Sequence, residues 1–148
     1  WAGPAHLVWP DGRRREFSME LIVAPTSDPK RYTWTVVYSE GSQRQERPYE
    51  LVVVDAAEGR YEIDEKNGIR LASTLIGGTL RSAFTVEGVQ VVTCERLERT
   101  PTGERIVSEM LSFDGRDPIT TGGGEVPPVA VIRPSTLQEA VLTRWAGK

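Results

Sequence analysis

Strict alternation of apolar and polar residues constrains this chain more than any other feature of its sequence. Tyr32, Trp34 and Tyr38 share one face of an extended segment, because successive side chains of a strand point to opposite sides. The same period of two returns over residues 80–86 and 89–95. Sustained alternation of this kind is typical of strands with one buried face. We therefore expect an all-β protein.

Turn-forming residues interrupt the alternation at short intervals. Asn67-Gly68 is a strong hairpin signal, because both residues tolerate positive φ. Residues 114–128 contain four glycines and three prolines, and we expect an irregular loop there. Residues 137–145 also fit a helical stripe, although the alternation before them favours a strand. The expected strands are residues 5–9, 15–23, 31–39, 48–55, 60–63, 69–76, 79–86, 89–97, 104–113, 129–132 and 137–144.

The short connections determine how these strands are expected to assemble. Strands joined in sequence by tight turns favour an up-and-down antiparallel order. A sheet with this many strands removes its exposed edges by closing into a barrel. A length of 148 residues is close to the commonest size of one domain. We therefore predict one domain, residues 1–148, folded as a single up-and-down antiparallel β-barrel of about ten strands.

Composition excludes several classes of protein. Hydrophobic residues make up 39% and charged residues 26% of the chain, which argues against disorder. No apolar run approaches the roughly 18 residues of a membrane-spanning helix, so we expect no membrane span. The net charge of -3 and the pI of about 5.3 argue against a nucleic-acid partner, which would call for a basic surface.

The scarcity of ligating residues argues against a metal or another cofactor. Cys94 is the only cysteine and His6 the only histidine, so the chain lacks the donor sets of common zinc and iron–sulfur sites. Cys94 lies within an expected strand and fits a small buried residue. The chain begins at Trp1 rather than Met. A removed signal peptide would account for this and would imply export, and an upstream domain or a choice of boundaries would account for it equally.

Polar residues that interrupt apolar strand faces are the candidates for chemistry. Glu95 and Glu109 each continue a largely apolar face, and a barrel cavity needs a few placed polar groups. Arg81 is a candidate partner for a buried carboxylate. The same residues also fit the solvent face of a strand or the rim of the barrel. The expected ligand-binding set is Tyr32, Trp34, Tyr38, Arg81, Glu95 and Glu109.

The two ends of the chain resemble the calycin group, which comprises lipocalins and fatty-acid-binding-protein-like barrels, and uncharacterised bacterial lipocalin-like domains. The resemblance is carried by Trp1-x-Gly3 and by Arg144 near the end of the last strand. In lipocalins a Gly-x-Trp motif on the first strand packs its indole against a late arginine and closes one mouth. The order here is Trp then Gly, and Trp9 is an equally good partner for Arg144. The resemblance implies barrel closure by Trp1 or Trp9 with Arg144. Haem-binding relatives of this shape use a late histidine that this chain lacks.

Three functions are compatible with such a barrel. We expect a non-enzymatic barrel that binds a small apolar ligand, which needs a cavity of about 300 Å³ or more. The alternative is a structural or protein-interaction barrel with a filled interior and an exposed apolar patch. A third is an enzyme that uses Glu95 or Glu109 at the barrel mouth, which needs paired carboxylates or a base beside a nucleophile. The oligomeric state and the ligand's identity stay open.

Overall fold

The computed structural model describes residues 1–145 and confirms an all-β fold. None of the described residues forms a helix of the length and hydrophobicity needed to cross a membrane. The ten strands are β1 (Ala2–Val8), β2 (Arg14–Pro25), β3 (Arg31–Glu40), β4 (Gln43–Asp55), β5 (Arg60–Asp64), β6 (Arg70–Ile76), β7 (Thr79–Val86), β8 (Val89–Thr100), β9 (Gly103–Gly123) and β10 (Val126–Thr143).

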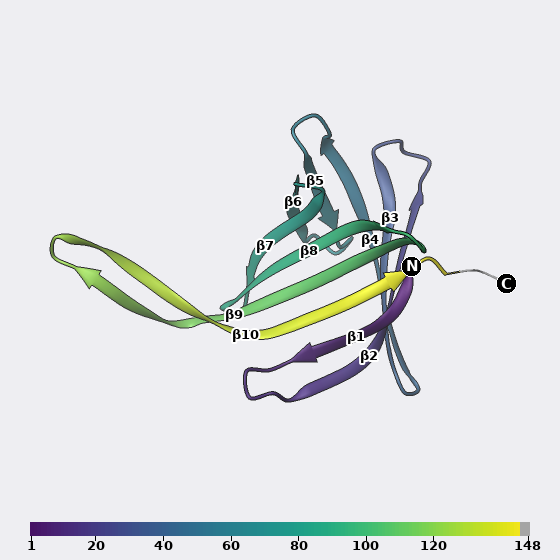
Figure 1. Cartoon of the computed structure of the whole chain (residues 1–148). Helices are drawn as coiled ribbons and strands as arrows, with labels where there is room; N and C mark the ends of the chain where they lie inside the picture. Colours follow the sequence, from purple (N-terminus) through teal and green to yellow (C-terminus); the bar gives the residue numbers. More distant parts are fainter. Residues whose placement is uncertain (146–148) are drawn as a thin grey trace.

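The strands form one closed antiparallel barrel. Each strand pairs with the next along the chain, and β1 pairs with β10 to complete the circle. The predicted up-and-down barrel is therefore confirmed. Figure 1 shows the first strand beside the last one, with the N-terminus close to the end of β10. Asn67-Gly68 lies in the tight connection from β5 to β6, as its residue types predict.

Cross-strand register decides which side chains face the interior. Met19 of β2 lies opposite Tyr38 of β3, and both contact the hydrophobic core. Facing residues of paired strands lie on the same side of the sheet. The register therefore identifies the inward-facing residues of every other strand, starting from Met19 and Tyr38. The buried core fills one half of the barrel, between β9, β10, β1, β2 and β3. It consists of Ala5, Met19, Leu21, Val36, Ile106, Ala140 and Leu142.

A long two-stranded arm leaves the barrel where β9 and β10 continue beyond their other neighbours. Figure 1 shows it extending far from the other strands. The predictions of an irregular loop over residues 114–128 and of two separate strands after it are wrong, because β9 and β10 run through this region as one hairpin with bulges. In the arm each strand pairs on one side only and has one free edge. A proline on that edge breaks no hydrogen bond between strands, because no partner strand lies there.

The arm defines the two ends of the barrel. The arm end carries the β1–β2 and β3–β4 connections, and the Trp1 end carries the N-terminus and the end of β10. At the arm end, residues 43–49 of β4 pair with β3 but not with β5, whose pairing begins at Glu50. The β3–β4 hairpin therefore projects beyond β5 and forms one wall of the arm end.

Candidate functional site

A cavity of about 580 Å³ lies at the arm end, within the range of small-molecule sites. Its apolar wall is made by Leu7, Phe17, Tyr38 and Met110, which the register places on the interior face of β1, β2, β3 and β9. Gln138 of β10 faces Met110 and adds an amide to the same wall. Strand alternation thus directs side chains from six strands, counting Arg47 of β4, into one space.

Arginines surround the opening of this arm-end cavity. Arg15 pairs with Glu40, and this guanidinium holds the pKa of the Glu40 carboxyl below its usual range. Arg44 pairs with Glu46 across 2.7 Å. Arg47 lies over the ring of Tyr38, with its guanidinium carbon 5.2 Å from the ring centroid. Among residues 1–145 no carboxylate pairs with Arg47, so its charge faces the opening without a counterion.

The predicted aromatic stripe faces the interior. Tyr32, Trp34 and Tyr38 lie opposite Pro25, Val23 and Met19 of β2 in turn, on the side of the core. All three are only partly buried. Tyr61 and Phe84, on the same face around the barrel, are also partly buried. Trp34 and Tyr38 pack against the hydrophobic core, whereas Tyr61 and Phe84 lie outside that buried cluster.

Glu95 lies inside the barrel without a partner. It faces Leu80 of β7 and Ser108 of β9, both of which are buried. Within the described residues its carboxyl forms no ion pair and accepts no side-chain hydrogen bond. Burial raises its pKa to about 7. Although protein surrounds it closely, Glu95 keeps some accessible surface, as expected of a group that lines an internal space.

Two predicted ligand-binding residues lie on the outside of the barrel. Arg81 and Glu109 both lie opposite Cys94 of β8, one residue before Glu95 and hence on the outer face. The Arg81 guanidinium donates to the Cys94 sulfur at 3.0 Å. Arg81 therefore does not approach Glu95. The structure brings Tyr32, Trp34, Tyr38 and Glu95 to the interior and leaves Arg81 and Glu109 out of it.

The Trp1 end shows the contact that the calycin resemblance implies. The Arg144 guanidinium carbon lies 4.8 Å from the centroid of the Trp1 ring, a cation–π arrangement. Arg144 also donates to Glu104 at 2.8 Å. Trp1 packs against the hydrophobic core, whereas Trp9 stacks with Arg13 at the arm end. Arg144 therefore pairs with Trp1 and not with Trp9.

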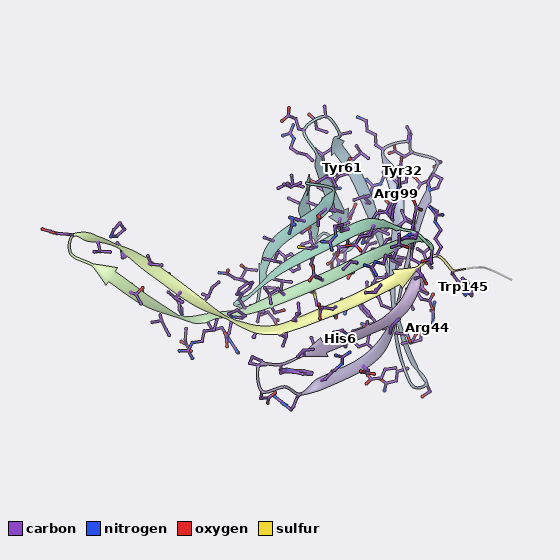
Figure 2. All side chains as sticks on the ribbon, in the orientation of Figure 1. His6, Tyr32, Arg44, Tyr61, Arg99 and Trp145 are labelled. Atoms are coloured by element: carbon purple, nitrogen blue, oxygen red, sulfur yellow. The ribbon has the colours of Figure 1, made fainter. Side chains whose placement is uncertain are left out.

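His6 and Cys94 point outward and do not enter the cavity. Nε2 of His6 lies 2.9 Å from Oε2 of Glu139 on the neighbouring strand β10. Figure 2 shows His6 on β1, at the seam where β1 and β10 meet and close the barrel. Among residues 1–145 no group of three histidine, cysteine or acidic side chains is close enough to hold a metal.

The sequence interpretation missed the arginines of the cavity. Arg15 continues the alternation of Phe17 and Met19, so its interior position was readable from the period of two. The position of Arg47 could not be predicted in this way, because residues 43–47 carry almost no apolar residues and were not predicted as a strand. Only the pairing of β3 with β4 places Arg47 on the interior face, beside Tyr38.

No protein-family model, no curated protein and no solved structure matches this chain. The function is therefore argued from the geometry of the barrel.

Proposed function

We propose that this protein is a non-enzymatic barrel that binds a small, largely apolar molecule inside, entering at the arm end. The observation that carries the proposal is the cavity of about 580 Å³ between inward-facing side chains of β1, β2, β3, β4, β9 and β10. Its wall of Leu7, Phe17, Tyr38 and Met110 offers an apolar surface, and Gln138 and Arg47 offer polar contacts. This combination is typical of ligand sites. A kinship with lipocalins or fatty-acid-binding-protein-like barrels is part of the same proposal, supported by the barrel and the Trp1–Arg144 contact.

The packing of the interior favours this function over a filled structural barrel. The buried core occupies the side of β9, β10, β1, β2 and β3. Tyr61 and Phe84, outside that core, face inward and stay partly accessible. A filled barrel would bury such rings almost completely, because protein interiors reach the packing density of organic crystals.

The placement of the carboxylates disfavours the enzymatic alternative. Glu95 faces the interior and Glu109 the exterior, on adjacent strands. The sheet therefore separates the two groups, which cannot act as an acid–base pair on one substrate. Glu109 lies beside Glu139 and Cys94 on the outer face of the sheet, where all three are partly buried.

Titration with the neutral fluorophore N-phenyl-1-naphthylamine tests the proposal. We expect saturable fluorescence enhancement with one site per chain. The variant Gln138→Trp fills the cavity and should weaken binding at least tenfold, an effect of about 1.4 kcal/mol. Leu137→Trp is the matched control, because Leu137 lies on the outer face beside the cavity residue. Absence of saturable binding, or equal binding by the two variants, would refute an interior site.

The arm supports a second candidate function, protein interaction through association with a second copy of this chain. Its apolar side chains are exposed, Ile119 at 45% and Val126 at 60%. A two-stranded ribbon of this kind has little stability of its own. Comparing the mass of the wild-type protein in solution with that of a variant lacking residues 117–131 tests this candidate. A larger assembly that depends on the arm would support it, and monomers in both cases would argue against self-association.

A further inference from the structure

The interior of the barrel contains a second polar position, deeper than the arm-end cavity. Met110, which lines that cavity, faces Thr93 of β8. Glu95 follows Thr93 on the same face, one step further toward the Trp1 end, and so lies diagonal to Met110. Diagonal neighbours of this kind are about 7–8 Å apart, the length of a short alkyl chain. Glu95 therefore lies one side-chain step beyond Met110, the cavity residue nearest to it along the register.

The surroundings of Glu95 are rich in hydroxyls and poor in charge. The hydroxyls of Ser82 on β7 and Ser73 on β6 form a hydrogen bond, with their oxygens 2.5 Å apart. Ser108 of β9 faces Glu95 directly. All three serines are buried. β6 to β9 thus place several hydroxyls near Glu95, among apolar inward-facing side chains such as Leu80 and Phe84.

Among residues 1–145, no cation pairs with the Glu95 carboxylate. Its interior neighbours on β7 and β9 are Leu80, Ser82, Ser108 and Met110, none of which titrates. Arg96, the next residue of its own strand, points outward and donates to Glu98 at 2.6 Å. An ionised carboxyl that protein surrounds without a cation is costly, and a ligand that brings the missing cation removes that cost.

We propose that Glu95 is the anchor for a cationic group of the ligand, so that the barrel takes small apolar amines. This inference rests on the proposed interior site and assigns the chemical class of its ligand. The ammonium group pairs with the Glu95 carboxylate and donates to the hydroxyl of Ser108, and the hydrocarbon part lies along Met110 and Tyr38. No covalent step is involved. Because burial raises the pKa of Glu95, protonation below neutral pH removes the anchor and releases the amine.

Calorimetric titration with three probes of equal chain length tests the inference. Octylamine, octanol and octanoate carry cationic, neutral and anionic head groups in turn at pH 8.5. We expect octylamine to bind most tightly at pH 8.5 and to lose about tenfold or more in affinity at pH 5.5. Glu95→Gln should lower octylamine affinity about 10–100-fold, the range of a charge-assisted hydrogen bond, and leave octanol unchanged. Glu109→Gln is the matched control, since the same change falls on the outer face.

The outcomes separate this inference from the proposed function. If octanol or octanoate binds in the cavity while octylamine has no advantage, or if Glu95→Gln leaves octylamine affinity unchanged, the amine anchor is refuted and the binding barrel stands. If octanoate binds best, the unpaired Arg47 at the opening selects the head group instead. If none of the three probes binds, both proposals fail.

Discussion

Glu95 should make the stability of the ligand-free barrel depend on pH in an unusual direction. Burial raises its pKa from 4.5 to about 7. Between these values the folded protein holds a proton that the unfolded chain has released. The free energy of unfolding therefore falls as the pH rises from about 4.5 to about 7, and this contribution stays lost above that range. Most carboxylates in ion pairs have the opposite effect.

The magnitude follows from the same two values. The difference between 4.5 and about 7 corresponds to roughly 3 kcal/mol at 1.36 kcal/mol per pKa unit. Because Glu95 keeps some accessible surface, water screens part of this cost, and we expect about 2 kcal/mol. Glu95→Gln lacks the titrating proton. Relative to wild type, it should gain about 2 kcal/mol of stability on going from pH 4.5 to pH 8.

Urea unfolding at pH intervals between 4.5 and 8.5 measures the effect. The protein is first refolded from denaturant, so that no bound molecule contributes. Glu109→Gln provides the control for a change on the outer face, and a His6→Asn background removes the single histidine from the comparison. If the stabilities of wild type and Glu95→Gln run parallel across this range, the carboxyl is not in the enclosed environment described above, and the reasoning is wrong.

Three further predictions concern the framework of the barrel. Gly3→Ala should lower stability by about 3 kcal/mol, and Tm by roughly 6–12 °C, because a Cβ at Gly3 would lie 2.1 Å from the carbonyl oxygen of Val141 in β10. Arg31→Met should lower Tm at pH 7, since Arg31 donates to the buried Asp64 at 2.8 Å. The backbone N–H of Lys66 and the Arg31 guanidinium lower the pKa of Asp64, so this loss should shrink as the pH falls into the acid range. Replacing residues 117–131 by Asn-Gly should change Tm by less than about 3 °C, because the arm strands pair only with each other.

Circular dichroism measures all three effects, and the first two predictions have a matched control variant. Gly41→Asn changes a glycine with open space around it and a φ of 58°, which asparagine tolerates, so it should unfold like wild type. Arg44→Met removes an exposed ion pair and should have little effect at any pH. If Gly3→Ala is as stable as wild type, the close approach of Gly3 to Val141 is contradicted. If the effect of Arg31→Met is constant with pH, the bond from Arg31 to Asp64 is contradicted. If the barrel unfolds without its arm, the arm does not pair only with itself.

The alternation in the sequence predicts the strands and the barrel because both depend on local period and short turns. It does not predict which face of β9 is the inner one. Val107, Glu109 and Leu111 form one largely apolar face, and Ile106, Ser108 and Met110 form the other. Only the pairing with β8 places Met110 inside and Glu109 outside. A shift of one residue would exchange the two faces, and register is a property of the whole sheet.

The arm escaped prediction for a different reason. Glycine and proline usually mark irregular connections, because proline cannot donate in a ladder and glycine favours turns. In the arm Pro118, Pro127 and Pro128 occupy a ribbon whose strands each have a free edge. This composition is incompatible with a central strand. A projecting hairpin satisfies the same constraint, and nothing local distinguishes it from a loop.

Native mass spectrometry of the protein purified from its source tests the central claim most directly. A barrel that binds a small molecule should carry an additional mass under native conditions that disappears on denaturation. The Gln138→Trp variant, produced in the same source, should lose that additional mass, and Leu137→Trp should keep it. A native mass equal to that of the bare chain in wild type, together with no uptake of N-phenyl-1-naphthylamine, would contradict a ligand-binding barrel.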